Sequence, residues 1–280
     1  MRTVALVAAA LIGFASNSLL CRAALGGPAI DAVSFTGVRL VSGALCLWLL
    51  VSATARSGSV ATAARRHRLL APLALFGYAI AFSLAYVRLP AGAGALVLFA
   101  AVQLTMIGWG LRTGERLPWT TWAGLTVAFA GLVVLCRPGR GSPDPAACLA
   151  MAVAGVAWGL YSLLGRGSAT PLRDTAGNFA RTVPLAALAS LMALSRLQAT
   201  PKGVALAVAS GALASAVGYS LWYAALPALS ATRAAIVQLL VPVIAAAGGV
   251  ALLGEAVTAR LLVAAGGIIG GVGLTLARPR

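Results

Sequence analysis

Charged residues are scarce in this chain of 280 amino acids: Asp, Glu, Lys and Arg make up 9% of it, whereas 61% is hydrophobic and the mean hydropathy is +0.97. Soluble domains carry roughly a quarter charged residues. So few charges cannot cover a surface that faces water, because the apolar side chains between them would associate. The composition therefore excludes an ordinary soluble protein and indicates that lipid is the solvent for most of the chain.

Acidic residues are scarcer than basic ones, with 5 Asp and Glu against 21 Lys and Arg, and the formal charge is +16. In a soluble protein this imbalance would suggest nucleic acid as a partner. Here the Arg residues lie mainly between apolar runs, where they meet lipid headgroups and orient the helices. We therefore expect no nucleic acid partner.

Carboxylates and histidine are absent from the middle of the apolar runs, although membrane proton relays need an ionisable group at depth. They lie in predicted loops or at predicted helix ends: Asp31, Asp144, Asp174, Glu115, Glu255 and His67. A hydrolytic membrane enzyme would need clustered Asp, His or Glu. We therefore expect no enzyme, no metal and no cofactor, and transport by facilitated diffusion or exchange without tight proton coupling.

The four cysteines form no metal-binding or disulfide framework, because no CxxC spacing or His pair accompanies them. Cys136 and Cys148 flank one predicted loop, which leaves a disulfide between them as an alternative. Because each of the two lies at a membrane-facing helix end, we expect all four to be ordinary helix-packing residues.

Apolar runs of spanning or near-spanning length fill the chain, separated by short segments of Arg, Pro and Gly. A cleaved signal peptide is the alternative for the first run, given Arg2 and the apolar stretch after it. The internal repeat described next argues against cleavage. The runs predict an all-α integral membrane protein with ten transmembrane helices, at 4–20, 33–53, 69–86, 91–111, 119–135, 146–164, 178–194, 204–223, 228–252 and 259–276.

The two halves of the chain resemble one another. Residues 18–22 (SLLCR) match 162–166 (SLLGR), residues 89–91 (LPA) match 226–228 (LPA), and Gly-Glu occurs at 114–115 and again at 254–255. Five helices per copy is an odd number, so the second copy enters the membrane from the opposite side. The sequence therefore predicts two inverted five-helix repeats, 1–137 and 146–280, joined by the polar loop 138–145.

Two five-helix halves, each ending with Gly-Glu and a Gly-rich last helix, resemble the EamA family of the drug/metabolite transporter superfamily over essentially the whole chain. Arg39 also resembles the Arg that this family carries in its second helix. The resemblance implies a central cavity lined by helices one, three, four, six, eight and nine, and alternating access between the halves. It implies export of amino acids or other metabolites, without naming the substrate.

Aromatic and neutral polar side chains recur on these helices. Phe14 and Asn17 lie within one helical turn, and Trp158 and Tyr161 repeat that spacing on the sixth helix. Such a wall holds an amphipathic ligand, and its amide and hydroxyl groups hydrogen-bond it. The substrate-binding candidates are Phe14, Asn17, Tyr78, Phe82, Gln103, Trp158, Tyr161, Tyr219, Trp222 and Gln238.

Several polar and small residues on these helices have structural alternatives. Tyr86 and Tyr223, near predicted helix ends, fit the interfacial aromatic belt better than the cavity. Gln103 and Gln238 are not exact repeat equivalents, so we expect them to face different directions, where an interhelical hydrogen bond explains either as well as ligand contact does. Glycines 266, 267, 270, 271 and 273 predict close helix packing or a subunit contact.

Pro242 predicts a functional break in the ninth helix. Its missing N–H leaves the carbonyl of Gln238 without its usual partner, and its ring crowds the same turn. An amide side chain and a free carbonyl would then lie together near the middle of the membrane. The alternative is a structural kink whose freed polar groups are satisfied by the protein alone.

Basic residues predict the orientation. With the N-terminus in the cytoplasm, the inside loops carry more Arg and Lys than the outside loops, mainly through the cluster at 65–68 (RRHR). We expect a multi-pass protein of the bacterial inner membrane with both termini cytoplasmic. The partners implied are a small-molecule substrate and the lipid bilayer; the oligomeric state stays open, a monomer included. The sequence thus indicates a transporter, with a non-transporting membrane sensor or scaffold as the alternative.

Overall fold

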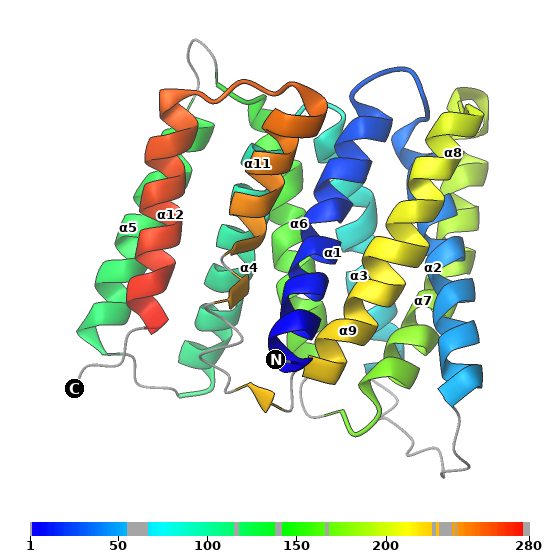
Figure 1. Ribbon diagram of the computed structural model, residues 1–280, viewed down its shortest axis with the longest axis horizontal. Coiled ribbons are helices and arrows are strands. Elements are labelled where there is room, and N and C mark those ends of the chain that lie inside the picture. Colours follow the sequence, from blue (N-terminus) through cyan, green and yellow to red (C-terminus); the bar gives the residue numbers. More distant parts are fainter. Residues whose placement is uncertain are drawn as a thin grey trace.

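The computed structural model describes residues 2–54, 67–114, 118–137, 142–165, 168–225, 228–229, 237–238 and 240–276. These residues form an all-helical protein (Figure 1). The first half contains α1 (Arg2–Leu25), α2 (Ala32–Thr54), α3 (His67–Tyr86), α4 (Ala91–Arg112) and α5 (Trp119–Cys136). The second half contains α6 (Pro145–Leu164), α7 (Pro171–Met192), the short η1 (Leu194–Arg196), α8 (Pro201–Val208), η2 (Ala209–Val217), α9 (Gly218–Ala225), α11 (Leu240–Leu253) and α12 (Ala259–Leu276).

Each predicted apolar run overlaps a described helix, and the run 204–223 overlaps α8, η2 and α9, which follow one another without a break. Seven described helices are long and apolar enough to cross a membrane, which makes this a multi-pass membrane protein. They are Thr3–Leu25, Ala32–Thr54, Leu69–Tyr86, Ala91–Arg112, Trp119–Cys136, Pro145–Leu164 and Pro201–Ala225. The apolar helices α11 and α12 are shorter, and α7 carries several charged residues.

Helix α7 begins seven residues earlier than predicted, at Pro171 rather than at residue 178. Proline suits the first helical position because its missing N–H has no partner there in any case. Asp174 lies in the first turn of α7, where a carboxylate interacts favourably with the helix dipole. Placing Asp174 in a loop was therefore wrong, because its polar surroundings concealed a helix start.

The ninth predicted helix is described from Leu240 onward as α11, together with residues 237 and 238. Pro242 is buried in the first turn of α11. Most of the preceding half of this run lies outside the described residues, so the break at Pro242 stays a prediction.

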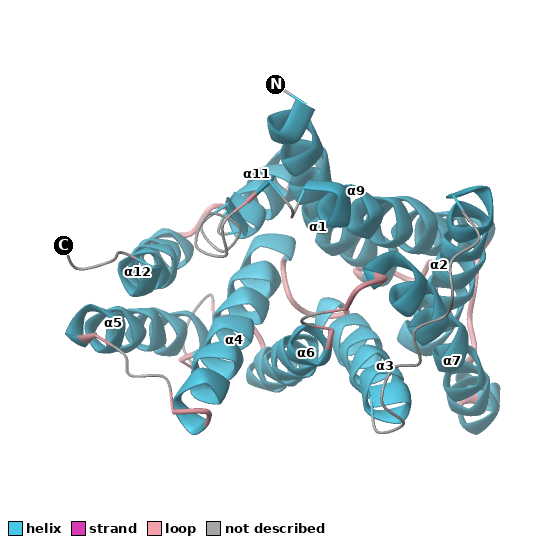
Figure 2. Cartoon of the chain, turned by 90° about the horizontal axis from the view of Figure 1, so that it is seen from below, coloured by secondary structure: helices cyan, strands magenta, loops and turns pink. Residues whose placement is uncertain are grey.

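The helices stand side by side in two rows when the molecule is viewed along them (Figure 2). One row contains α4, α6 and α3, and the other contains α11, α1 and the α8–α9 run, with packing contacts between neighbours within each row. The pairs α5–α12 and α2–α7 close the two ends. The core of the molecule lies between the rows.

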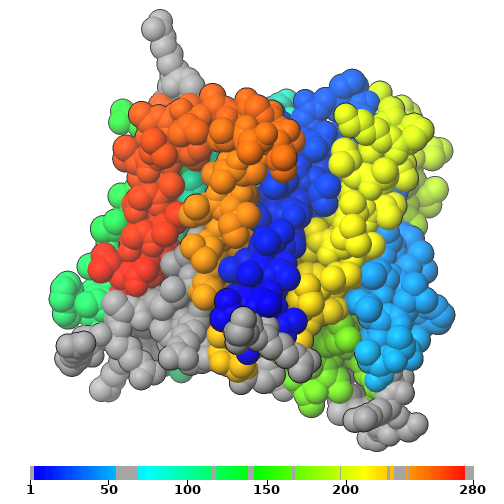
Figure 3. Space-filling model, in the orientation of Figure 1, coloured from blue at the N-terminus to red at the C-terminus, as the bar shows by residue number. Residues whose placement is uncertain are grey.

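Large apolar side chains cover much of the outer surface, including Trp48, Leu149 and Leu191, which are more than half exposed. On the face in Figure 3, α1 packs between α11 and the α8–α9 run. A lipid-facing surface of this kind requires every backbone group to be satisfied within the helices. The exposed apolar surface is therefore the expected contact with hydrocarbon.

Helices α5 and α12 pack closely through glycines. A side chain added at Gly271 would lie 2.5 Å from the backbone of Ala128 and Gly124, and Gly267 faces Gly131 in the same interface. Gly266, Gly270 and Gly273 face open space. Close packing within the chain thus explains Gly267 and Gly271, and for the three glycines that face away from α5 the alternative of a subunit contact stays a prediction.

The repeated Gly-Glu pair has a common local structure at its glycines. Gly114 follows α4 with φ +86°, and Gly254 follows α11 with φ +66°. Only glycine adopts this left-handed conformation without strain, and it commonly ends helices. Glu115 lies outside the described residues.

Candidate functional site

A cavity of about 470 Å³ lies between the two rows of helices. Its walls come from α1, α3, α4, α6, α7 and α9, together with residue 238. All ten residues proposed from the sequence line this cavity: Phe14, Asn17, Tyr78, Phe82, Gln103, Trp158, Tyr161, Tyr219, Trp222 and Gln238. Their contact with a ligand stays a prediction.

Aromatic rings form a continuous wall in the cavity. The rings of Trp158 and Tyr219 stack with their centroids 5.3 Å apart, and Tyr78 lies 4.8 Å from Trp158. Phe14 lies 5.8 Å from both Tyr219 and Trp222. Offset and tilted arrangements such as these are favourable. The wall is thus suited to an apolar or aromatic ligand group.

Two polar candidates of the cavity, Asn17 and Tyr161, accept hydrogen bonds from neighbouring hydroxyl and amide groups. Ser210 and Ser215 donate to Asn17 Oδ1 at 2.8 and 3.3 Å. Both serines come from η2, a stretch of π-helix. The Tyr161 hydroxyl accepts from Asn178 Nδ2 at 3.5 Å. π-helical turns often occur at functional sites, because the extra residue redirects the neighbouring side chains.

Gln103 and Gln238 line the same cavity. The expectation that they face different directions stays a prediction, because two walls of one cavity can hold them.

Helix α7 contributes a polar side of the cavity that the sequence analysis missed. Asp174, Thr175 and Asn178 line it, and the Ser168 hydroxyl donates to Asp174 Oδ2. Ser168 and Gly165 extend the lining to the α6–α7 connection, at the end of the molecule where α1 begins (Figure 1). Polar residues spaced three and four apart from position 171 would have indicated this helical face.

The aromatic-belt interpretation was wrong for both tyrosines. Tyr86 is fully buried, and its hydroxyl donates to the carbonyl of Ala91 at 3.2 Å. Tyr223 lines the cavity and accepts a 3.5 Å hydrogen bond from Thr175. Nearness to a predicted helix end thus did not indicate exposure to the membrane surface.

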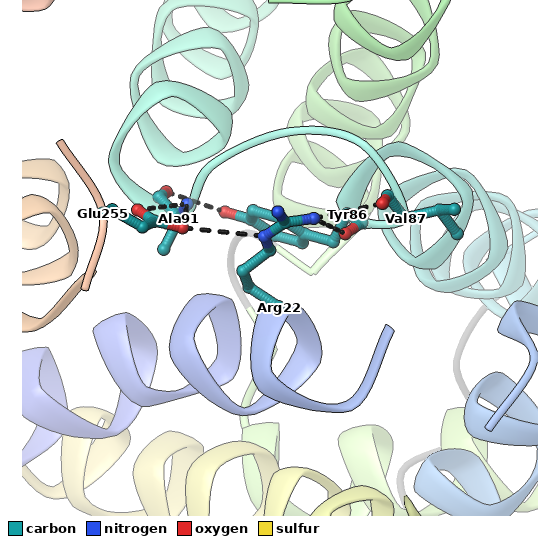
Figure 4. A network of polar contacts seen from close by, with 5 residues as sticks. All are labelled: Arg22, Tyr86, Val87, Ala91 and Glu255. Atoms are coloured by element: carbon teal, nitrogen blue, oxygen red, sulfur yellow. Dashed lines mark hydrogen bonds and ion pairs between the residues drawn. The ribbon is translucent and has the colours of Figure 1, made fainter. Parts of the chain in front are cut away.

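Ser18 and Phe82 line the cavity, and about one turn beyond them, at the ends of α1 and α3, lies a polar cluster (Figure 4). The carboxylate of Glu255 accepts from Ala91 N at 2.8 and 2.9 Å, at the start of α4, and its Oε1 lies 3.6 Å from Arg22 Nε. Arg22 Nη1 also donates to the carbonyls of Tyr86 and Val87 at 3.2 and 3.0 Å. These contacts, here called the Arg22–Glu255 bridge, join the ends of α1, α3, α4 and α11.

A second tie at this end joins the α1–α2 loop to residues 198–200. Asp31 accepts from the backbone N–H of Val33, Ser34 and Gln198 at 2.9, 2.9 and 2.8 Å. Burial alone would raise the pKa of Asp31, but the hydrogen bonds, those of Ser34 first, bring it below its ordinary value. Asp31 is therefore ionised at neutral pH and joins the α1–α2 loop to residues 198–200 through its hydrogen bonds.

A second carboxylate at this end, Asp144, is also ionised more readily than usual. The backbone N–H of Ala147 lowers its pKa most, followed by the neighbouring Arg88, whose Nη1 lies 3.0 Å away. This ion pair is largely exposed. Exposed pairs of this kind stabilise proteins little.

Arg39 is almost fully buried in α2, with 1% of its surface exposed. Its Nη2 donates to the Tyr78 hydroxyl at 3.1 Å and to Ser215 Oγ at 3.4 Å. Its guanidinium carbon lies 5.3 Å from the ring centroid of Tyr78 and 5.0 Å from that of Phe82. Nη1 has no hydrogen-bond partner among the described residues. A single charge in the apolar run 33–53 was visible in the sequence, but its neighbours were not.

Comparisons with known proteins extend over the whole chain. The sequence pattern of the EamA-like transporter family matches residues 145–277. An uncharacterized protein of Pseudomonas aeruginosa is 49% identical over 276 residues, which is 99% of this chain and 95% of the relative. A probable terminal-alkyne amino-acid exporter of Streptantibioticus cattleyicolor is 27% identical over 281 residues, 96% of this chain and 91% of the relative. A solved crystal structure, 22% identical, shares the fold with a TM-score of 0.65 over 96% of both chains.

Proposed function

This chain belongs to the EamA-like transporter family of the drug/metabolite transporter superfamily, and we propose that it exports amino acids or similar amphipathic solutes by alternating access. One observation carries the proposal: the lining of a central cavity, built by both halves of the chain, reaches the α6–α7 connection at one end of the molecule. We infer that the Arg22–Glu255 bridge, about one turn beyond the lining residues Ser18 and Phe82, closes the other end. A site accessible from one side at a time is what alternating access requires.

The arrangement of the helices supports two inverted repeats of five helices, 1–137 and 146–280. If α1 to α5 are exchanged with α6, α7, the α8–α9 run, α11 and α12 in that order, one row of helices becomes the other. The packed pair α3–α6 then corresponds to the pair of the α8–α9 run and α1, which is also packed. The packed pair α4–α6 corresponds to α11–α1, which is packed as well. The pairs α5–α12, α2–α7 and α4–α11 exchange with themselves. An inverted repeat gives the two alternating states the same geometry on opposite sides.

Amino acids fit the chemistry of the cavity. Phe14, Trp158 and Trp222 offer apolar surface for a side chain, while Asn17 and Gln103 offer hydrogen bonds for polar ends. The relative from Streptantibioticus cattleyicolor that is named a probable terminal-alkyne amino-acid exporter supports the same class of cargo. A pocket of about 470 Å³ is in the range that small-molecule sites occupy.

The proposed location is the bacterial inner membrane with both termini in the cytoplasm, because the loops at that end carry the basic cluster 65–68. Cysteines placed singly at Ala169 and Lys202, in a chain whose four native cysteines are replaced by alanine, test the orientation. An impermeant thiol reagent applied to intact cells should label position 202 and leave position 169 unlabelled. Labelling of both positions from outside would contradict the inverted topology.

Transport into proteoliposomes tests the function itself. Vesicles loaded with single amino acids, aromatic and aliphatic, should exchange them across the membrane only when they contain the protein. Asp174, the one described carboxylate that lines the cavity, is the group through which protons would couple to transport. A pH gradient alone should drive no accumulation of the amino acid. If a pH gradient does drive accumulation and Asp174→Asn abolishes it, the hypothesis of exchange without proton coupling is excluded.

A further inference from the structure

A positive charge lies buried in α2, and none of the carboxylates that the structure describes balances it. The four carboxylates that the structure describes are engaged elsewhere: Asp31 with Gln198 N, Asp144 with Arg88, Asp174 with Ser168 and Glu255 with Arg22. A guanidinium cannot lose its proton to escape the cost of burial. The rings of Tyr78 and Phe82 compensate part of that cost through cation–π contact. Arg39 therefore remains a source of positive potential within the membrane.

Arg39 lies one side chain behind the cavity wall. Tyr78 and Phe82 separate its guanidinium from the cavity that they line. Ser215 accepts from Arg39 and connects it to Asn17, which also lines the cavity. Hydrogen bonds thus link the guanidinium of Arg39 to two residues that line the cavity. One bond reaches the Tyr78 hydroxyl directly, and the other reaches the Asn17 amide through Ser215.

The direction of these hydrogen bonds leaves two donor groups available on residues that line the cavity. Because Ser215 accepts from Arg39, its own hydrogen goes to Asn17 Oδ1, which also accepts from Ser210. With its oxygen occupied, Asn17 offers its NH₂ group to a ligand. The Tyr78 oxygen likewise accepts from Arg39, so its O–H is available to donate. Two donors, both polarised by a buried cation, are the groups that bind an anion.

We propose that Asn17 and Tyr78 form a carboxylate subsite of the cavity, with Arg39 as the positioning residue that gives it its charge. The inference rests on the proposed function and narrows it: the substrate carries a carboxylate at this subsite and extends an apolar body along the aromatic wall. An otherwise identical ligand whose carboxylate is replaced by an uncharged amide binds at least tenfold more weakly.

Ligand pairs that differ only in this group test the subsite. The intrinsic tryptophan fluorescence of the purified protein, to which Trp158 and Trp222 of the cavity contribute, is titrated with L-phenylalanine, L-leucine and L-threonine and with the amide of each. The wild-type protein should bind the acids at least tenfold more tightly than the amides. Equal binding of acids and amides, or no binding of any of these acids, overturns the subsite.

Variants distinguish a loss of carboxylate recognition from a loss of the folded structure. Arg39→Gln should reduce the acid-to-amide ratio to about one without loss of amide binding, and Arg39→Lys should restore part of it. Tyr78→Phe, which keeps the ring and removes only the hydroxyl, should lower the ratio even if Arg39→Gln fails to fold. Thr54→Ala, at the exposed end of α2, is the control that keeps the ratio. An unchanged ratio in folded Arg39→Gln or in Tyr78→Phe overturns the subsite.

The experiments distinguish a failure of the proposed transport function from a failure of the carboxylate subsite. Flux of acids and amides at equal rates in proteoliposomes would leave transport standing and remove the carboxylate subsite. A purified protein that prefers the acids in solution but moves none of them across the membrane would keep the subsite and remove transport.

Discussion

Polar side chains at depth are the residues on which the cavity depends, because an amide in a low-dielectric site must find a partner. Gln238 lines the cavity together with Gln103 of α4. Leucine at position 238 is compatible with the membrane and removes only the amide. Gln238 is therefore the position in the ninth predicted helix whose substitution best tests contact with the ligand.

Gln238→Leu should insert and fold normally and bind the transported amino acid about three- to tenfold more weakly, the loss of one neutral hydrogen bond. The measurement is the Kd for the transported amino acid, together with its rate of exchange. Val243→Leu, a change at an exposed position of α11, is the matched control. Unchanged binding and exchange in Gln238→Leu would remove this amide from the site.

A second residue-scale prediction concerns the pH dependence of Asp31. Its pKa is lower in the folded protein than in the unfolded chain, so its stabilisation is fully present above the unfolded pKa of about 3.9 and is lost as the pH falls through the folded value. At pH 7, Asp31→Asn should lower the free energy of unfolding by about 1 kcal/mol, solvent screening included.

Thermal unfolding of the detergent-solubilised protein between pH 7 and pH 3 measures the effect of Asp31. The difference between wild type and Asp31→Asn should shrink below about pH 4, where the wild-type carboxyl becomes protonated. Lys202→Gln changes one charge at the same end of the molecule and should show no such trend. A difference that stays constant down to pH 3 would mean that the ionised carboxylate of Asp31 is not the group that stabilises the loop.

The candidate site could be predicted from the sequence where its residues follow a helical spacing. Phe14 and Asn17 on the first helix, and Trp158 and Tyr161 on the sixth, were found through that spacing, and all four line the cavity. Asp174 was missed because hydropathy assigns polar residues to loops. The surroundings of Arg39 could not be predicted, because they depend on the contact between α2 and the π-helical turn of the second half.

At the scale of helices, boundaries were predictable where the apolar run is continuous: α12 occupies Ala259–Leu276, the range that the sequence predicts. The start of α7 at Pro171 was not predictable in this way, because its first turns are polar. The π-helix η2 was not predictable, because no residue pattern distinguishes its hydrogen bonding from that of an α-helix. A Cβ at Gly211, within η2, would lie 2.1 Å from the carbonyl oxygen of Arg39. The close approach of η2 to α2 therefore becomes evident only from their packing.

Adjacent glycines of α12 give a matched pair of helix-packing variants. Gly271→Ala places a methyl group 2.5 Å from the backbone of α5, which must move away, at a cost of about 1–3 kcal/mol. Gly270→Ala meets open space and should leave stability unchanged or raise it by up to about 1 kcal/mol through helix propensity. Thermal unfolding in detergent measures both. Equal destabilisation by the two changes would contradict the orientation of α12.

At the scale of the whole molecule, alternating access requires the covered end of the cavity to open. The Arg22–Glu255 bridge covers this end by joining a side chain on α1 to the start of α4, whose N–H groups favour a carboxylate. Its ion pair is partly buried and is reinforced by backbone hydrogen bonds, unlike the exposed pair between Arg88 and Asp144. Weakening this bridge should therefore shift the population of states without unfolding the protein.

Glu255→Gln should favour the state that is open at this end, because the neutral amide keeps one acceptor for Ala91 N and loses the attraction to Arg22. A loss of about 1 kcal/mol of this attraction corresponds to a change of about fivefold in the ratio of the two states.

A cysteine at Ser18, which lines the cavity one turn before Arg22, reports the opening when the native cysteines are replaced. An impermeant thiol reagent applied on the side of Lys202 should label it about five times faster in Glu255→Gln. Asp144→Asn breaks the exposed pair at the same end, retains an acceptor for Ala147 N, and should leave the rate unchanged. Equal labelling rates in wild type and Glu255→Gln would show that the bridge does not hold this end closed.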